Sequence, residues 1–424
     1  MKIKVTDLSY DEVMNLPAPE HVLPKKQSRF ARFLLSALSS GEVKAVDFKY
    51  NKIDMDRLGK DEPALFLMNH SSFTDLMIAA KMLRKRQYHI ITTNDGFIGK
   101  EKLMRFIGCI PTQKFITDMT LVKDMQYTFK ELNSSILMFP EASYSFDGSA
   151  TPLPESLGKF IKIMKVPVVT IHTKGAYLRD PLYNNLQKRN AKVTSTMKYL
   201  LSPEDTKSMT PAQINELLRK EFTYDHFRAQ TADNVIVNES FRADGLHRPL
   251  YKCPHCLSEG NMHGKGTEIT CHECNTITTL EENGLLCTRE KDSLFKYVTD
   301  WYSWERECVA NELKDNTYEM VLDVDIMILA DNKSMYRVGS GTLTHNCDGF
   351  TLTGCDGKLN YTQKPLSSYG LYSDYFWYEI GDMISIGDTH HQYYCFPKDQ
   401  ESAIVAKARL ATEELYKLRK FAAQ

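Results

Sequence analysis

Short apolar runs alternate with helical patterns between residue 44 and about residue 235. The chain is 424 residues long, so two or three domains are expected. Strands that alternate with helices predict an α/β layer with a mostly parallel sheet flanked by helices. The predicted strands cover 64–68, 89–93, 107–111, 135–139 and 166–171, with helices over 76–83 and 118–132. Catalytic residues are then expected just beyond the carboxyl ends of the strands.

The pattern changes near residue 240, where a cysteine-rich segment is followed by alternating β-type runs. The turn-forming pairs Asp348-Gly349 and Asp356-Gly357 are typical of antiparallel hairpins. A helix is expected from about 400 to 420, with Ile404, Ala408, Ala411, Leu415 and Leu418 on one face. Six or seven strands before one closing helix resemble the pleckstrin-homology-like topology, which binds lipid headgroups or protein segments.

The sequence therefore divides into four predicted parts. They are an N-terminal segment (1–43), an α/β domain (44–240), a cysteine-rich module (250–280) and a β-rich C-terminal domain (290–424).

Charge and hydropathy restrict the cell location and partners. The net charge is −1 and the sequence pI is near 6.9, which argues against a nucleic-acid binder driven by bulk phosphate attraction. The first residues lack the apolar core of a signal peptide, and no apolar run reaches the length of about 18 residues that spans a membrane. We expect a cytoplasmic protein with at most peripheral contact at the inner membrane face.

One segment has the pattern of a peripheral membrane helix. Apolar residues recur at 30, 33, 34, 37 and 38, and basic residues precede and flank them within 25–38. This spacing predicts an amphipathic helix, and the basic flank suits an anionic lipid surface. A helix that packs on the protein core would have the same spacing, so both interpretations stay open.

Four of the ten cysteines form two Cys-x-x-Cys pairs with fourteen residues between them. The pairs are Cys253 with Cys256 and Cys271 with Cys274. This spacing is typical of a zinc ribbon, in which four thiolates close a tetrahedral site. A closed shell has no open coordination position, so the predicted zinc is structural. His255 and His272, inside the two pairs, are alternative ligands.

Two further groups of residues in the C-terminal half have side chains that are common in binding sites. His390 and His391 beside Asp388 suggest a metal site, but an exposed hairpin turn explains the same residues. Trp301 and Trp304 are expected to anchor a core.

His70 and Asp75 are the predicted catalytic pair. His70 follows a predicted buried strand, and Asp75 lies five residues later in the first turns of a helix. A hydroxyl needs a base to attack a thioester, and neutral histidine serves at physiological pH. An aspartate that folds back to the ring fixes its tautomer and stabilises the imidazolium. The acceptor substrate itself is the nucleophile in this arrangement.

A lone histidine and aspartate are weak evidence, but three further blocks follow in order. Together with the block that contains the pair, the four blocks are Asn69, His70, Ser72 and Asp75; Lys102, 108–111 and Lys114; 139–145; and 166–169. In these blocks the chain resembles the glycerolipid acyltransferases, typified by 1-acyl-glycerol-3-phosphate acyltransferases. The resemblance covers roughly 45–230. It implies an O-acyltransferase that moves a fatty acyl group from acyl-CoA or acyl-carrier protein to a hydroxyl of a lysophospholipid or related glycerolipid.

The resemblance also implies substrate-binding residues, with two departures from the family pattern. The residues are Asn69, Ser72, Lys102, Lys114, Glu141, Ser143, Tyr144 and Lys159. Tyr144 stands where the family has an Arg associated with the acceptor's phosphate, and Ala142 replaces a Gly. Tyr offers no charge and no bidentate fork, so an acceptor without phosphate is an alternative. Glu141 is expected to orient the acceptor's hydroxyls or, alternatively, to hold a nearby loop by backbone N–H bonds.

A second class of function competes with catalysis. Zinc ribbons often bind nucleic acid or protein, so the chain is alternatively an adaptor built on a degenerate acyltransferase. The ribbon has only Lys252 and Lys265 as basic residues, and both His70 and Asp75 are intact. Nucleic acid is therefore not expected as a partner, whereas a protein partner at the ribbon or the C-terminal domain is compatible with the sequence.

Overall fold

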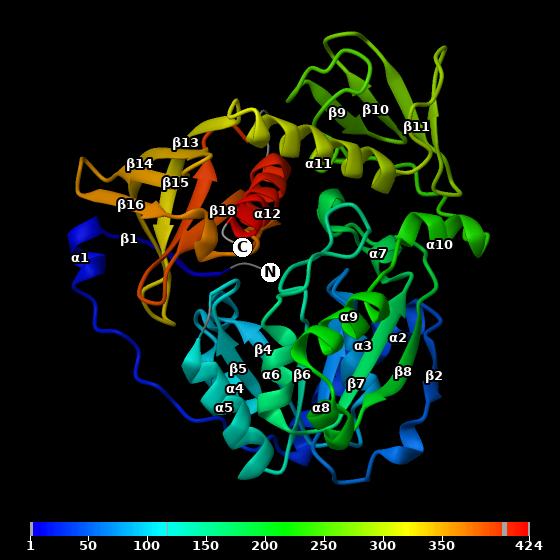
Figure 1. Ribbon diagram of the computed structural model, residues 1–424, viewed down its shortest axis with the longest axis vertical. Coiled ribbons are helices and arrows are strands. Elements are labelled where there is room, and N and C mark those ends of the chain that lie inside the picture. Colours follow the sequence, from blue (N-terminus) through cyan, green and yellow to red (C-terminus); the bar gives the residue numbers. More distant parts are fainter. Residues whose placement is uncertain (1–2, 117, 401–404, 423–424) are drawn as a thin grey trace.

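The computed structural model describes residues 3–116, 118–400 and 405–422. Three sheets organise these residues: a seven-stranded sheet, a four-stranded sheet and an eight-stranded sheet. Figure 1 shows the seven-stranded sheet in one half of the molecule, with the other two sheets above it on opposite sides. The predicted α/β class is confirmed, together with the β-rich C-terminal region that ends in a helix.

The α/β unit is built on the seven-stranded sheet, in the order β2-β8-β7-β3-β6-β4-β5. Its strands are β2 Lys49–Ile53, β3 Leu65–Met68, β4 Tyr88–Thr93, β5 Cys109–Thr112, β6 Ser135–Met138, β7 Val168–Lys174 and β8 Thr194–Leu201. Strands β7, β3, β6, β4 and β5 are mutually parallel, whereas β8 runs antiparallel to β7. The five parallel strands direct their carboxyl ends to one edge, where His70 follows β3.

Helices cover both faces of this sheet. Successive side chains of a strand point to opposite faces, and Leu65 and Leu67 contact a different apolar cluster from Phe66 and Met68. One face packs on α3 (Thr74–Met82), on which α2 (Arg29–Ala45) lies. The other face packs on α5 Met119–Lys130, α6 Leu157–Met164 and α9 Pro211–Glu221.

The remaining helices connect these layers and the other two parts. They are α1 Tyr10–Met14, α4 Glu101–Phe106, α7 Ala176–Arg179, α8 Pro203–Ser208, α10 His226–Ala232, α11 Val298–Lys314 and α12 Val405–Ala422. Short 3-10 helices cover Met55–Arg57, Asn94–Phe97, Leu182–Asn184 and Pro365–Ser367. Asp118 caps α5 as its sequence predicts, by accepting a bond from the N–H of Thr120 at 2.7 Å. Ile404, assigned to the closing helix from sequence, lies outside the described residues.

The predicted amphipathic helix exists as α2, but its apolar stripe faces outward. Phe30 is 65% exposed, Phe33 54% and Leu38 73%, whereas Ala31 and Val43 on the other side of the helix are buried. The interpretation of this stripe as a core-packing face is therefore wrong. Small residues such as Ala31 instead let α2 approach α3 closely.

The four-stranded sheet carries the cysteine-rich module. Its order is β12-β11-β10-β9, with β9 Met262–Lys265, β10 Glu268–Cys271, β11 Ile277–Leu280 and β12 Leu286–Thr288. All neighbours are antiparallel. The module packs through α11, where Trp301 is buried and donates its indole N–H to the carbonyl of Lys252 at 2.9 Å. Trp301 is thus a core anchor, as expected.

The C-terminal domain contains two antiparallel meanders in one sheet. The first strand of the first meander, β13, pairs with the last strand of the second meander, β19. The strand order of this sheet is β16-β15-β14-β13-β19-β18-β17, followed by α12. The strands are β13 Glu319–Ile328, β14 Met335–Asn346, β15 Gly349–Gly354, β16 Leu359–Gln363, β17 Tyr372–Trp377, β18 Gly381–Gly387 and β19 Gln392–Pro397. Seven strands before one helix agree with the predicted element count, while the pleckstrin-homology-like resemblance itself stays a prediction.

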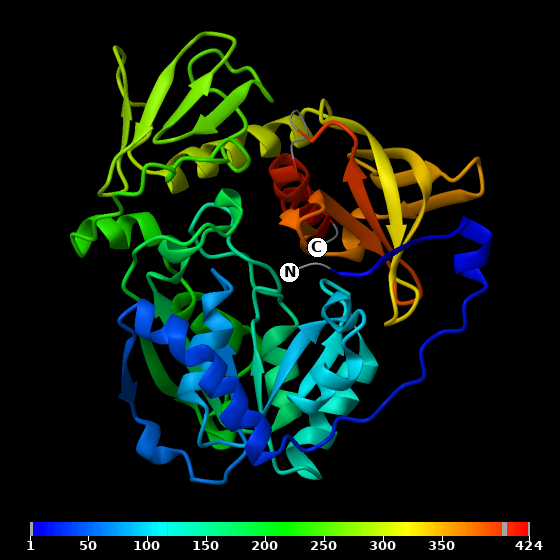
Figure 2. The same cartoon turned by 180° about the vertical axis from the view of Figure 1, so that it is seen from behind.

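The start of the chain joins this distant domain. Strand β1 (Val5–Asp7) pairs parallel to β14, with Val5 opposite Met335. From there the chain runs along the outside of the molecule to α2, as the blue ribbon of Figures 1 and 2 shows. The first forty residues therefore contact both large parts of the protein.

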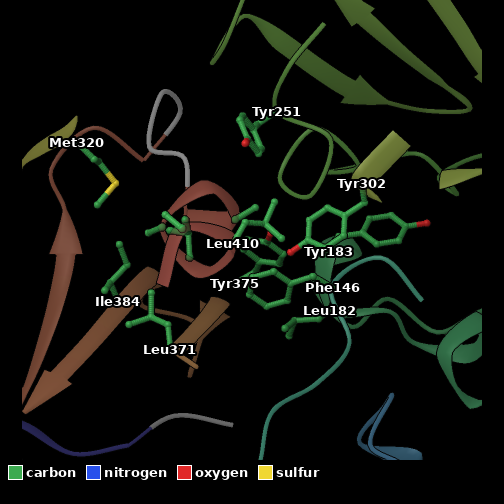
Figure 3. Close-up of a cluster of buried hydrophobic side chains, with 14 of the residues drawn as sticks. Phe146, Leu182, Tyr183, Tyr251, Tyr302, Met320, Leu371, Tyr375, Ile384 and Leu410 are labelled. Atoms are coloured by element: carbon green, nitrogen blue, oxygen red, sulfur yellow. The ribbon is translucent and has the colours of Figure 1, made fainter. Parts of the chain in front are cut away.

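A common apolar core joins the three parts. Figure 3 shows Phe146 from the α/β unit, Tyr302 from α11 and Leu410 from α12 around Tyr375 of β17. The rings of Phe146 and Tyr375 stack with centroids 4.2 Å apart. Burying aromatic side chains of this size stabilises a fold by about 2 kcal/mol each. The C-terminal domain is therefore fixed against the α/β unit.

The hairpin at Asp388 is a turn, as expected. His390 and His391 donate their backbone N–H groups to Asp388 Oδ1 at 2.8 and 3.0 Å. Neither ring belongs to a metal-ligand cluster of the described residues.

Gly175 provides a test of the junction between β7 and α7. Its φ is +85°, and an added Cβ would lie 2.1 Å from the carbonyl oxygen of Lys192. Gly357 has φ +83° with nothing within 4 Å of an added Cβ. Both Gly→Ala variants bear the left-handed backbone cost of about 1 kcal/mol, but Gly175→Ala must also displace a backbone. We expect the free energy of unfolding of Gly175→Ala to be lower than that of Gly357→Ala by at least about 2 kcal/mol. In urea unfolding, Gly175→Ala should therefore have the lower midpoint. Equal midpoints for the two variants would contradict this clash.

Candidate active site

His70 and Asp75 lie together at the carboxyl end of β3. His70 Nδ1 is 3.3 Å from Asp75 Oδ2. Asp75 is in the first turn of α3, so the helix directs its carboxylate back toward the end of the strand. With Nδ1–H donating to the carboxylate, Nε2 carries the lone pair of a base. None of the described residues bonds Nε2.

Backbone groups hold the Asp75 carboxylate. Oδ2 also accepts bonds from the N–H of Ser71 at 2.7 Å and of Ser72 at 3.0 Å, whereas Oδ1 is buried without a partner. Burial raises the pKa of Asp75 to about 7, against the lowering effect of these two N–H groups. Burial, and secondly the charge of Lys114, hold the pKa of His70 well below its usual value. The imidazole is therefore neutral at physiological pH.

Two aromatic rings enclose the imidazole. Phe139 stacks on one side with centroids 4.0 Å apart, and the ring of Tyr144 lies 4.1 Å away at an interplanar angle of 32°. Phe139 follows β6, the strand next to β3, so the sheet order places it there. These rings fix the plane of the imidazole.

Glu141 joins three segments around His70. Oε1 accepts from the N–H of His70 at 3.3 Å, and Oε2 accepts from the N–H and hydroxyl of Thr151 at 3.0 and 2.8 Å. The Tyr224 hydroxyl donates to the same carboxylate, at 2.8 Å from Oε2. Burial raises the pKa of Glu141 to about 7 despite these donors. The bonds agree with the loop-holding interpretation of Glu141.

Asn69 and Ser72 bond within the protein. The Asn69 amide exchanges two bonds with the backbone of Thr173, at 3.0 and 2.8 Å, which ties the end of β3 to β7. The Ser72 hydroxyl donates to Asp180 and accepts from the N–H of Thr74 at 2.9 Å at the start of α3. Both side chains therefore orient the segment that carries His70.

Lys114 lies at the contact with the C-terminal domain. Its Nζ is 4.0 Å from the ring centroid of Tyr372 in β17. The Tyr372 hydroxyl donates to Asp95 Oδ2 at 2.5 Å, and the indole N–H of Trp377 donates to the same oxygen at 3.2 Å. Burial lowers the pKa of Lys114, whereas Asp374 and Asp95 act to raise it. Lys114 is thus enclosed by residues of both domains.

The loop that contains Ser143 and Tyr144 is bound by an arginine of α12. Arg409 donates to Ser143 Oγ at 2.8 Å and to the carbonyl of Tyr144 at 3.1 Å. Its Nε faces Glu413 at 3.3 Å, and its guanidinium lies 4.3 Å from the centroid of Phe146. A residue far along the chain thereby holds the backbone of Tyr144, whose ring lies against His70.

The other two predicted lysines lie elsewhere. Lys102 is exposed on α4 and Lys159 is exposed on α6. The bonds and ring contacts that join the described residues around His70 do not include them. Their assignment to the acceptor site therefore stays a prediction without structural support.

Several residues that build this site belong to none of the motifs in the sequence. They are Asp95, Thr151, Asp180, Tyr224, Asp374 and Arg409. Each reaches the site through tertiary packing from a segment without a recognisable motif. One signal in the sequence could have indicated Arg409: it is a charged residue among the apolar residues that form the buried face of α12.

The four predicted cysteines form one cluster. Their sulfur atoms all lie within 4.8 Å of one another, with Cys253 and Cys274 3.7 Å apart and Cys256 and Cys271 3.6 Å apart. A tetrahedral zinc with bonds of about 2.3 Å requires sulfur separations of about 3.8 Å. The cluster therefore fits one zinc ion, without a place for His255 or His272 among its ligands.

Known proteins resemble the part of the chain that contains His70 and Asp75. Residues 49–174 match the acyltransferase family model. A human relative, 1-acyl-sn-glycerol-3-phosphate acyltransferase beta, is 24% identical over 168 residues, which are 39% of this chain and 59% of the human protein. The chain thus spans less than two thirds of that relative. The crystal structure of PlsC, the 1-acyl-sn-glycerophosphate acyltransferase from Thermotoga maritima, shares 14% identity, with a TM-score of 0.37 over 45% of this chain and 76% of that one.

The cysteine cluster predicts a defined metal content. Purified protein should contain about one zinc per chain by mass spectrometry of the metal. Cys274→Ser should lose that zinc and lower the thermal midpoint, because the small module depends on its ion. Cys287→Ser, at an exposed cysteine, is the matched control and should keep the zinc content and the thermal midpoint of the wild type. Full metal content in Cys274→Ser would exclude this cluster as the zinc site.

Proposed function

We propose that the chain is an O-acyltransferase that moves a fatty acyl group from a thioester to a hydroxyl of a glycerolipid. The observation that carries this proposal is the His70–Asp75 pair, in which none of the described residues bonds Nε2, within the segment that matches the acyltransferase family model. The human relative is named for an acceptor with a glycerol 3-phosphate headgroup, so a lysophospholipid or related glycerolipid is the acceptor class that the comparison supports.

The proposed mechanism uses His70 as a general base. Nε2 removes the proton of the acceptor's hydroxyl while that oxygen attacks the thioester carbonyl. The carbon–oxygen bond forms, the carbon–sulfur bond breaks, and the proton on the imidazolium passes to the departing thiolate. Asp75 stabilises the transient imidazolium and keeps Nδ1 protonated. Acyl-CoA and acyl-carrier protein both supply this thioester chemistry.

Helix α2 supports a peripheral membrane role. None of the described helices is long and apolar enough to cross a membrane. The exposed Phe30, Phe33 and Leu38 instead form an apolar face next to the basic segment that begins at Lys25. Such a face inserts at the lipid interface while lysines and arginines contact anionic headgroups. The acceptor, itself a lipid, would be reached from that surface.

We assign the cysteine cluster a structural role. A zinc ion there would be held by four thiolates and would have no open position for a substrate. The module lies on the far side of α11 from the α/β unit (Figure 1). Zinc would therefore stabilise the arrangement of domains.

His70 provides the direct test of the mechanism. His70→Ala should lower kcat/KM for transfer from acyl-CoA to a lysolipid acceptor by about 10³-fold, since the general base is lost. His390→Ala, at an exposed ring in a turn, should keep wild-type rates and is the matched control. Product formation is followed by mass spectrometry of the lipids, and unchanged circular dichroism confirms folding. Turnover by His70→Ala comparable to wild type would exclude the mechanism.

Protonation of Asp75 is expected to set the acid limb of the profile of kcat/KM against pH. As the pH falls through about 7, Asp75 takes up a proton and loses the charge that stabilises the imidazolium, so activity falls. His70 stays neutral over this range because its pKa is lowered. We expect kcat/KM to fall about tenfold per pH unit below the limb. The limb should persist in Glu141→Gln, whose overall rate is reduced; its loss there would assign the limb to Glu141.

A further inference from the structure

The C-terminal domain supplies an acidic residue, Asp374, next to Lys114. Asp374 and Tyr372 are two residues apart on β17, so they point to the same face of the strand. The Tyr372 ring covers Lys114 at 4.0 Å, which places Asp374 on the Lys114 side. Asp374 Oδ1 is buried without a hydrogen-bond partner, and the charges of Lys114 and Asp374 act on each other.

Asp95 adds a second carboxylate around the same lysine. Its Oδ2 is held by Tyr372 and Trp377, and its Oδ1 is likewise buried without a partner. Lys114 therefore has two acidic neighbours in a region from which water is largely removed. Its positive charge is compensated by the protein itself.

Arg409, a second cation of this region, has no free pair of N–H donors for a bidentate contact with a phosphate. Arg409 places its Nε toward Glu413 and its two Nη atoms on Ser143 and Tyr144. Tyr144, at the position of the family arginine, has its ring on the imidazole and offers a hydroxyl without charge. Neither residue presents the bidentate donors that recognise a phosphate.

We propose that Asp374 is a specificity-determining residue that excludes acceptors with a phosphate monoester, so that the enzyme acylates an uncharged glycerolipid alcohol. A phosphate monoester would have to enter beside two carboxylates and compete with Asp374 for Lys114. A neutral acceptor meets no such repulsion, and its hydroxyl needs only the base on His70. This inference rests on the proposed function and narrows its acceptor.

The test compares two acceptors of equal acyl chain, monoacylglycerol and 1-acylglycerol 3-phosphate, with acyl-CoA and the full chain. Assays at about pH 8 keep Asp374 ionised, because burial raises its pKa only to about 7. Wild type should prefer the neutral acceptor in kcat/KM by at least about tenfold, which is about 1.4 kcal/mol. Asp374→Asn should shift the ratio toward the phosphate acceptor by about tenfold, and Asp348→Asn, at an exposed turn of the same domain, should not.

The ratio of kcat/KM for the two acceptors in the wild-type protein tests the inference even if Asp374→Asn folds poorly. Preference of wild type for the phosphate acceptor, with activity that depends on His70, would overturn this inference and leave the proposed function intact. An unchanged ratio in folded Asp374→Asn would also overturn it. Absence of His70-dependent transfer to either acceptor would overturn the proposed function, and this inference with it.

Discussion

The bond network of Arg409 connects α12 to the imidazole of His70. Arg409 holds the backbone of Tyr144, and Tyr144 packs on His70. Glu413 balances the charge of Arg409 and also accepts from Arg306 of α11 at 2.7 Å. Removing one partner of such a buried network typically costs about 3–5 kcal/mol. The geometry around His70 thus depends on helices that lie outside residues 49–174, the segment that matches the acyltransferase family model.

Local sequence patterns predicted the parts of the site that the chain builds within a few residues. His70 and Asp75 meet because one ends a strand and the other begins a helix, and the cysteine pairs meet because their turns repeat the same knuckle. The strands were recognisable as short buried runs between helical patterns. These features depend on short-range geometry, which sequence spacing encodes directly.

Tertiary packing determined what the sequence did not show. Asp374 and Arg409 follow His70 by about three hundred residues, and no motif marks either of them. The stripe on α2 illustrates the same limit, because spacing predicts an amphipathic helix but not which side faces the protein. Small residues on the opposite side allowed close approach to α3 and left Phe30 and Phe33 outside. Glu141 was assigned two roles from sequence, and the four donors around its carboxylate favour the loop-holding one.

The pairing of β1 with β14 has a consequence for synthesis on the ribosome. Val5 leaves the exit tunnel long before its partner Met335 is translated, so β1 must wait without its neighbour for most of elongation. The α/β unit and the cysteine module can fold during that interval, because their strands pair within their own segments. The first strand would then dock late, when the C-terminal sheet forms. Its attachment would report that the C-terminal sheet has been made and assembled.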